Sequence, residues 1–476
     1  MLHTPRFSFL DIILNVAVTS QGAGSAVDGL PMPARIGAIF AIAFGIAMAV
    51  LDGALVNVAL PTIAADFNTS PASSIWIVNA YQLAITMTLL SLSSLGDIVG
   101  YRRVYLVGLV LFTLMSVVCA LADSLPTLTL ARILQGLAAA ALMSVNTALI
   151  RLIYPKDKLG RGMAINSLVV AVSTAAGPTI AAGILGVASW QWLFAINVPF
   201  GIVALLLGWR FLPRNDGVRA QRFDAPSALL NALTFGLFFI ALGGFAQGQN
   251  LWQVLGELAL TLLVGGYFVR RQLSQSYPLL PVDLLRIPVF ALSVGTSVSS
   301  FCAQMLAMVS LPFYFQSALG MNEIETGLLL TPWPLAIMAV APLAGRWLER
   351  VNAGVLCTIG LSLFALGLFS LAWLPASPGY LDICLRMVLC GIGFGLFQSP
   401  NNHTIISAAP RHRSGGASGM LGTARLVGQT AGAALVALMF NLFGGQGTHA
   451  ALITAGVFAA LAAVVSGQRI SRLSSR

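Results

Sequence analysis

Long, uninterrupted apolar runs constrain the fold of this chain more than any other feature. The runs are roughly 20 residues long, which is the length that a helix needs to cross a bilayer. Only 8% of the 476 residues are charged, whereas soluble domains carry about a quarter of their residues as charges. A transmembrane β-barrel would instead alternate apolar and polar residues in stretches of about ten. The sequence therefore predicts an all-α membrane protein.

Fourteen such runs can be distinguished. They lie near residues 36–60, 74–96, 104–122, 125–151, 164–187, 190–211, 227–247, 251–269, 289–316, 326–347, 354–374, 381–408, 417–442 and 449–467. If the N-terminus is cytoplasmic, the loops on that side receive all 25 basic residues except Arg132, Arg386 and Arg425, which lie within runs. Basic loops mark the cytoplasmic side, and one miscounted helix would invert every later loop. We therefore expect fourteen helices in the cell inner (cytoplasmic) membrane, with both termini in the cytoplasm. The net charge of +10 then reflects topology and not a nucleic-acid partner.

The two halves of the chain resemble each other. Five residues recur at one constant offset: Gly136, Asn146, Pro155, Gly160 and Gly177 return as Gly391, Asn401, Pro410, Gly415 and Gly432. Parallel repeats of six helices are a transporter architecture. We predict a flexible extension (1–35), a first six-helix bundle (36–212), an inserted helix pair with its linkers (213–288), a second bundle (289–468) and a cytoplasmic tail (469–476).

Four motifs carry a resemblance to a known family. They are LDGALVNVALP at 51–61, LGDIVGYRR at 95–103, ARILQG at 131–136 and the Gly-Pro pair at 177–178. Together they resemble motifs of the major facilitator superfamily, specifically of its fourteen-helix drug:proton antiporter branch, and the resemblance covers nearly all of residues 36–468. It implies the major facilitator fold and proton-driven export. Ala181 and Ala182 stand where the antiporter motif of that branch usually has two glycines.

Asp52 is a carboxylate inside the first predicted helix. An ionised carboxylate at the centre of a membrane helix costs about 2.5–3.5 kcal/mol on insertion scales. Burial favours its neutral form, so Asp52 could take up and release a proton when water reaches it from alternate sides. The alternative is a permanently paired packing residue. For Arg132 the resemblance implies a part in proton coupling, by tuning a carboxylate such as Asp52, and the alternative is a fixed hydrogen-bond anchor between helices.

The resemblance also implies a cytoplasmic gate formed by Asp97, Gly100, Arg102 and Arg103. Gly100 permits a tight turn, and Asp97 could face the unpaired backbone N–H groups at the start of the helix near 415–420. Ordinary inside-positive topology would account for the two arginines individually.

Gly177 and Pro178 predict a bend in the fifth helix, because proline removes one backbone donor. Small neighbours would allow close contact with another helix. A plain kink is the same physical object, so only the resemblance connects this pair with antiport.

Polar and aromatic side chains within the runs are candidates for a substrate cavity, because polar residues in membrane helices usually face the protein interior. The candidates are Asn79, Gln82, Gln304, Trp333, Phe397, Gln398 and Asn401. Each could equally serve as a contact between helices. Arg425 is near enough to the cytoplasmic end of its helix for its side chain to reach the interface. Glu257 and Arg386 have no predicted role.

The sequence thus predicts a secondary active transporter that exports small organic molecules, drug-like, lipophilic or cationic, in exchange for protons. Proton-coupled uptake of a metabolite or organic acid is the alternative on the same fold. The sequence has no His, Cys and carboxylate cluster with metal spacing and no phosphate-binding Gly-x-x-x-x-Gly-Lys-Ser/Thr. We therefore expect a monomer in the lipid bilayer that handles a small-molecule substrate and protons, and no enzyme activity, cofactor, metal or nucleic-acid partner.

Overall fold

The computed structural model describes residues 29–215, 223–246, 249–275, 278–375, 377–410 and 413–473. Thirteen stretches of these residues are long and apolar enough to cross a membrane. One of them, Gly416–Arg469, has 54 residues, which at about 1.5 Å per residue far exceeds the thickness of a bilayer. It contains two helices, α17 (Ser414–Phe443) and α18 (Gly447–Leu473), joined by the 3-10 turn η5 (Gly444–Gln446). The described residues therefore contain fourteen spanning helices, as predicted.

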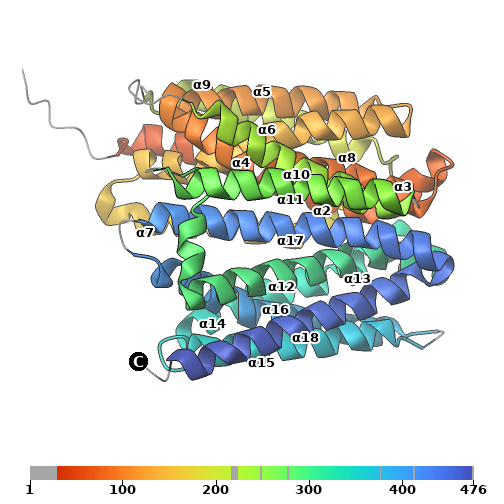
Figure 1. Cartoon of the computed structure of the whole chain (residues 1–476). Helices are drawn as coiled ribbons and strands as arrows, with labels where there is room; N and C mark the ends of the chain where they lie inside the picture. The colour runs from red at the N-terminus through yellow and green to blue at the C-terminus, as the bar shows by residue number, and fades with distance from the viewer. Residues whose placement is uncertain are drawn as a thin grey trace, which may run out of the picture.

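The first bundle forms the upper half of the molecule in Figure 1. Its helices are α2 (Met32–Asp66), α3 (Pro71–Ser74), α4 (Trp76–Val99), α5 (Tyr101–Ala120), α6 (Leu125–Ile153), α7 (Leu159–Leu185), α8 (Trp192–Ala195) and α9 (Asn197–Phe211), with the 3-10 turn η1 (Lys156–Lys158) before α7. α2 begins at Met32, earlier than the predicted start at residue 36. Most of the predicted N-terminal extension, residues 1–28, lies outside the described residues.

The second bundle forms the lower half of Figure 1. Its elements are the 3-10 turn η2 (Val282–Arg286), α12 (Pro288–Phe313), the π-helical turn η3 (Tyr314–Ala318), α13 (Glu323–Leu330), α14 (Pro332–Trp347), α15 (Ala353–Ala372), α16 (Tyr380–Ala408), α17 and α18. α18 continues as a helix to Leu473, into the region predicted as a tail, and the side chain of Arg469 is only 1% exposed. Arg469 is buried because Ser293, Asn401 and Ser466 accept its hydrogen bonds, at 2.6–2.8 Å.

The packing of the second bundle repeats that of the first. α2 packs on α7 and α9, as α12 packs on α17 and α18, and α6 packs on α4 and α5, as α16 packs on α14 and α15. Gly136 and its repeat Gly391 occupy equivalent contacts. A Cβ at Gly136 would lie 2.5 Å from the carbonyl oxygen of Tyr81, and one at Gly391 would lie 2.3 Å from that of Trp333. The recurring glycines therefore let α6 and α16 approach a neighbouring backbone in the same way.

The inserted helices α10 (Ala225–Ala246) and α11 (Leu251–Leu273) pack on each other. α10 also packs on α4 and α17, so it covers the seam where the two bundles meet on the side seen in Figure 1. Asn231 Nδ2 donates a hydrogen bond of 2.8 Å to the carbonyl oxygen of Met87. Asp224, just before α10, pairs with Arg271 of α11 at 2.9 Å. Burial acts to raise the pKa of Asp224, but hydrogen bonds from Ser227, Gln275 and Arg271 outweigh it and lower that pKa to about 2.

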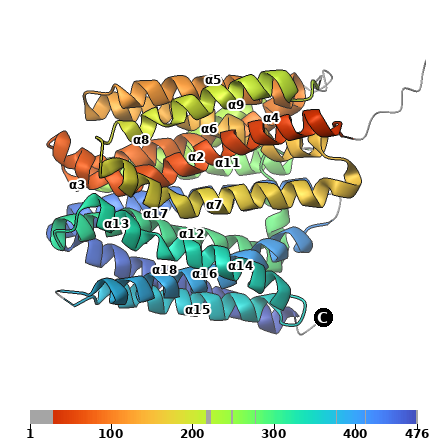
Figure 2. The ribbon, with the colours of Figure 1, turned by 180° about the vertical axis from the view of Figure 1, so that it is seen from behind.

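The other side of the seam is seen in Figure 2, where α7 lies along the boundary beside α13 and α14. We call the end of the molecule where α2 begins and α4 ends the basic end, because Arg102, Arg103, Arg151 and Arg210 lie there. At the opposite end the bundles are joined directly. Thr62 Oγ1 donates to Glu323 Oε1 at 3.2 Å.

Two further contacts join the first bundle to the second near the end opposite the basic end. Gln316 Nε2 donates to the carbonyl oxygen of Val58 at 3.0 Å. A Cβ at Gly327 of α13 would lie 2.4 Å from the carbonyl oxygen of Pro178 of α7, so α13 and α7 touch backbone to backbone. Only glycine allows this approach at position 327.

We predict that Gly327→Leu holds the bundles apart at the opposite end, because the new side chain would overlap Pro178. Pulsed electron spin resonance between labels at the exposed positions 123 and 377 should show longer distances than in the parent protein. Gly295→Leu is the matched control, because nothing lies within 4 Å of a Cβ at that position. An unchanged distance distribution in Gly327→Leu would contradict this view of the contact.

Candidate functional site

A buried ion pair between Asp52 of α2 and Arg132 of α6 lies inside the first bundle. The exposed fraction of Asp52 is 1% and that of Arg132 is 0%. Arg132 Nη1 donates to Asp52 Oδ2. The other carboxylate oxygen, Oδ1, accepts from Gln135 Nε2 at 3.1 Å and from Asn197 Nδ2 at 3.0 Å. Three helices, α2, α6 and α9, thus converge on one carboxylate, and the predicted partner of Asp52 is in direct contact with it.

Aromatic rings and a backbone carbonyl complete the surroundings of Arg132. Its Nη1 also donates to Gln135 Oε1 at 2.7 Å, and its Nε donates to the carbonyl oxygen of Ile77 at 3.3 Å. The guanidinium carbon lies 4.0 Å from the centre of the Tyr81 ring and 5.6 Å from that of Phe194, which favours a cation. Nη2 is buried and has no hydrogen-bond partner among the described residues.

The sequence analysis missed the two amides of this cluster, Gln135 and Asn197. Gln135 Nε2 also donates to Ser116 Oγ of α5 at 3.0 Å, so the amide network reaches a fourth helix. Gln135 stands three residues after Arg132, on the same face of α6, and this spacing could have identified it. No comparable signal marks Asn197, which is distant in sequence.

A cavity of about 160 Å³ lies between the two bundles. This volume is below the roughly 300–1,000 Å³ of sites for drug-sized ligands. Its lining comes from α2, α4, α6 and α7 of the first bundle and from α12, α13, α14 and α17 of the second. Asp52 is not among the lining residues, but its neighbours Ala49 and Gly53 on α2 are. The ion pair therefore lies directly behind the cavity wall.

Three of the seven predicted cavity residues line this space, namely Gln82, Gln304 and Trp333. Asn79, Phe397, Gln398 and Asn401 do not. Phe397 packs against Phe394 inside the second bundle, with 5.6 Å between ring centres. Asn401 Nδ2 donates to Ser297 Oγ at 2.8 Å, and its Oδ1 accepts from Arg469 at 2.7 Å. These side chains lie on the face of α16 that packs within its own bundle.

Arg425, whose distance from the helix end would allow its side chain to reach the membrane interface, lines the cavity between the bundles. The other intramembrane charges have local environments. Arg386 pairs with Asp382 at 2.9 Å and donates to the carbonyl oxygen of Ser370, which makes it an anchor within the second bundle. Glu257 of α11 has one buried carboxylate oxygen without a partner in the described structure.

The predicted gate residues lie at the basic end, where α4 turns into α5. Gly100 has φ +98°, and a Cβ there would lie 2.5 Å from the carbonyl oxygen of Asn215, so only glycine fits. Arg102 donates to the carbonyl oxygen of Trp209, and Arg103 donates to that of Val99 at 3.4 Å. These contacts stay within the first bundle and the segment that follows α9, and none of them reaches the second bundle.

Asp97, the acidic member of the gate motif, is exposed. It accepts a hydrogen bond of 2.6 Å from the hydroxyl of Tyr101. The predicted partner, the start of α17, belongs to the other bundle. In this conformation Asp97 therefore contacts its own bundle.

Gly177 and Pro178 lie where α7 meets both α2 and the second bundle. A Cβ at Gly177 would lie 2.5 Å from that of Ala54. Pro178 lines the cavity. Ala182, which replaces a glycine of the antiporter motif, lies against Gly327 with 2.6 Å to a Cβ placed there, so its small size is needed for the contact between bundles.

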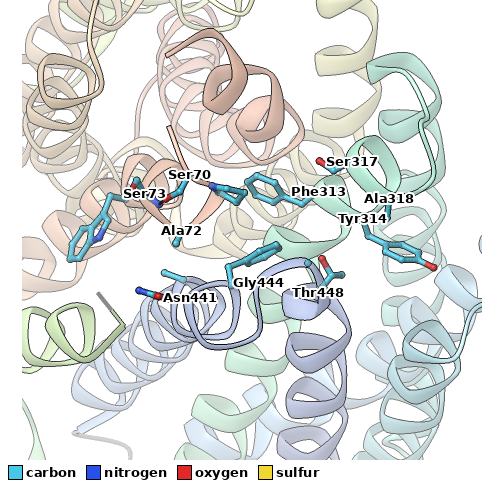
Figure 3. Close-up of a pocket in the computed structure, with 15 residues that line it drawn as sticks. Ser70, Ala72, Ser73, Phe313, Tyr314, Ser317, Ala318, Asn441, Gly444 and Thr448 are labelled. Carbon is cyan, nitrogen blue, oxygen red and sulfur yellow. Dashed lines mark hydrogen bonds between the residues drawn. The ribbon is translucent and has the colours of Figure 1, made fainter. Parts of the chain in front are cut away.

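Figure 3 shows a larger hollow, of about 830 Å³, at the opposite end of the molecule. It lies between α3, the end of α12 and the turn that joins α17 to α18. None of its lining residues is charged, and neither Asp52 nor Arg132 lines it. Its chemistry is therefore separate from that of the ion pair.

We predict that Asp52→Asn lowers the stability of the protein by about 3–5 kcal/mol, because it leaves Arg132 as a buried charge without a counter-charge. Adding Arg132→Met removes that charge and should restore part of the loss. The measurement is the apparent melting temperature, in one detergent, of Asp52→Asn, of Arg132→Met and of the double variant. The double variant should melt above Asp52→Asn, and losses that simply add would contradict the pairing.

Comparisons with known proteins agree with this architecture. The family model described as Major Facilitator Superfamily matches residues 42–433 and again 297–470. The uncharacterized transporter YebQ of Escherichia coli (strain K12) is 67% identical over 94% of this chain and 98% of its own length. The tetracenomycin C resistance and export protein of Streptomyces glaucescens is 32% identical over 87% of this chain and 77% of its own.

One solved structure illustrates the shared fold. A peptide transporter POT in complex with sulfate superposes with a TM-score of 0.70 at 14% sequence identity, over 91% of this chain and 94% of that chain. The packing of two repeated bundles, the family match and the relatives lead to one conclusion. The chain belongs to the major facilitator superfamily, a family of multi-pass membrane transporters of small molecules and not of enzymes.

Proposed function

We propose that this protein is a proton-coupled antiporter that exports small organic molecules by alternating access. The observation that carries the proposal is the buried ion pair of Asp52 and Arg132 directly behind the wall of the cavity. Protonation of Asp52 removes the negative charge and frees Arg132 from its counter-charge. Deprotonation restores the pair. Both states need a route for water to Asp52, which a rearrangement of the bundles supplies.

Tyr81 connects the ion pair with the cavity. One face of its ring packs on the guanidinium of Arg132, and the residue also lines the cavity. Its hydroxyl donates to the carbonyl oxygen of Ala49 on α2 at 2.9 Å. A cargo molecule that displaces Tyr81 would therefore disturb Arg132 and α2 together. This shared side chain is a physical means of coupling cargo to protons.

The basic residues set the orientation of the protein in the cell inner membrane. The basic end faces the cytoplasm, because basic loops remain on that side, and both termini are then cytoplasmic. Gly177 and Pro178 lie at the contact between the bundles that must open and close. The relative from Streptomyces glaucescens, which is named as an export protein, supports export.

The described conformation is then closed toward the outside, where Thr62, Gln316 and Gly327 make their contacts between the bundles. In the opposite conformation Asp97 would meet the start of α17, whose free backbone N–H groups favour an anion. The moving bodies would be the bundles 36–212 and 289–468, with the helix pair 213–288 covering one seam. A single chain contains all of these parts, so we propose that the monomer is the working unit.

The test uses inverted membrane vesicles that hold a proton gradient. Candidate drugs and metabolites should release protons from vesicles with the parent protein, and Asp52→Asn should abolish this release because it removes the titrating group. Asp123→Asn is the matched control, since Asp123 is an exposed carboxylate at the opposite end. A pH-sensitive fluorophore measures the release.

Two outcomes would overturn the proposal. Proton release that is unchanged in Asp52→Asn would remove Asp52 from the mechanism. Movement of cargo in the same direction as protons would replace export with uptake.

A further inference from the structure

The cavity between the bundles contains an arginine without a partner. Arg425 of α17 is half-buried and lines the cavity. Among the described residues it has no hydrogen-bond or ion-pair partner. No Asp or Glu is among the residues that line the cavity. The carboxylate of Asp52 is already paired with Arg132 behind the wall.

A guanidinium within the membrane needs hydrogen-bond acceptors, because arginine does not lose its proton in proteins and a desolvated charge without a counter-charge is costly. No amide oxygen of the described cavity wall accepts a hydrogen bond from Arg425, so the acceptor can come from water or from a bound anion. Bound anions are favoured over water by the charge itself, and Arg presents a planar fork that matches a carboxylate.

A second donor points to the same kind of ligand. Trp333 is fully buried, and its indole Nε1 has no hydrogen-bond partner in the described part of the chain. It lines the same cavity as Arg425. An indole N–H only donates, so this group also requires an acceptor. The two unmatched donors come from different helices, α14 and α17.

The rest of the wall is largely apolar. Ile85 and Met143 of the first bundle and Met305, Met308, Leu330 and Leu426 of the second line the cavity. Methionine side chains adapt to ligands of different shape. The wall also contains the amide side chains of Asn57, Gln82, Gln304 and Gln429. Among the described residues it thus combines an adaptable apolar surface with two donors that lack acceptors, from Arg425 and Trp333, and one buried acceptor that lacks a donor, Asn57 Oδ1.

We propose that this cavity binds amphipathic organic monoanions, with Arg425 holding the anionic group, Trp333 donating a second hydrogen bond and the methionines contacting the apolar body. This rests on the proposed transport function and names its cargo class. Organic cations, which the sequence analysis names as one of three kinds of cargo, would meet the unpaired positive charge of Arg425 and be repelled.

The test measures binding to the purified full-length protein in detergent, without a proton gradient. The probes in one set share an apolar body and differ in their head group. The first set is 4-phenylbutyrate, 4-phenylbutyramide and 4-phenylbutylamine, and two further sets carry the same three head groups on naphthyl and octyl bodies. The shift of the apparent melting temperature with probe concentration gives the dissociation constant. The carboxylate should bind about tenfold or more tightly than the amide, because a hydrogen bond to a charged group contributes about 1.5–3 kcal/mol, and the amine should bind more weakly still.

Substitutions then assign the preference to one side chain. Arg425→Gln should abolish the preference for the carboxylate, and Arg425→Lys, which keeps the charge, should retain part of it. Arg270→Gln is the matched control, because Arg270 is an exposed arginine of α11. Its loss should leave the preference for the carboxylate probe unchanged. The proposal is overturned if the amine binds as tightly as the carboxylate, if no body shows a carboxylate preference, or if the preference survives in Arg425→Gln. Because this assay needs no gradient, its result is independent of whether Asp52 couples transport to protons.

Discussion

The ion pair between Asp52 and Arg132 is the interaction on which the rest of this account depends. Two opposite charges at the middle of a membrane protein are costly to bury and costly to separate. The first bundle offsets part of that cost with further partners, namely Gln135, Asn197 and the ring of Tyr81. In the proposed mechanism this pair has two discrete arrangements, paired when Asp52 is ionised and released when it is protonated. A change of one proton can therefore favour one of two packings of the helices around it.

The repeated bundles give this local change a large effect. Gly136 and Gly327 bring helices to backbone contact, and Gly177 lies against the Cβ of Ala54. Such close contacts can be made or lost but not lengthened gradually. α2 and Tyr81 take part both in the ion-pair cluster and in the cavity wall. Arg425 faces the same cavity from the second bundle. The proposed proton site and the proposed cargo site are thus different places that share the side chain of Tyr81 and the helix α2.

Much of the fold could be predicted from the sequence, because run length and the side of the basic loops fix the number of helices. The constant offset between Gly136 and Gly391 likewise predicted equivalent contacts that the structure contains. The cavity could be predicted only in part. A helix that is apolar on all sides does not reveal which face turns toward a cavity. The same reasoning therefore selects Gln82 and Trp333, which line the cavity, and Phe397 and Asn401, which do not. For Arg425, the distance from the helix end allows the side chain to reach the membrane interface, and only the tertiary packing shows that it lines the cavity.

The most direct measurement of the central claim is infrared difference spectroscopy of the reconstituted protein during a pH titration. A carboxyl C=O band should appear as the pH falls, shift in heavy water and be absent in Asp52→Asn. These results would show that the buried carboxylate exchanges its proton with water. If no band depends on Asp52 at any pH at which the protein transports its cargo, the pair with Arg132 is a permanent structural contact, and the account of coupling is wrong.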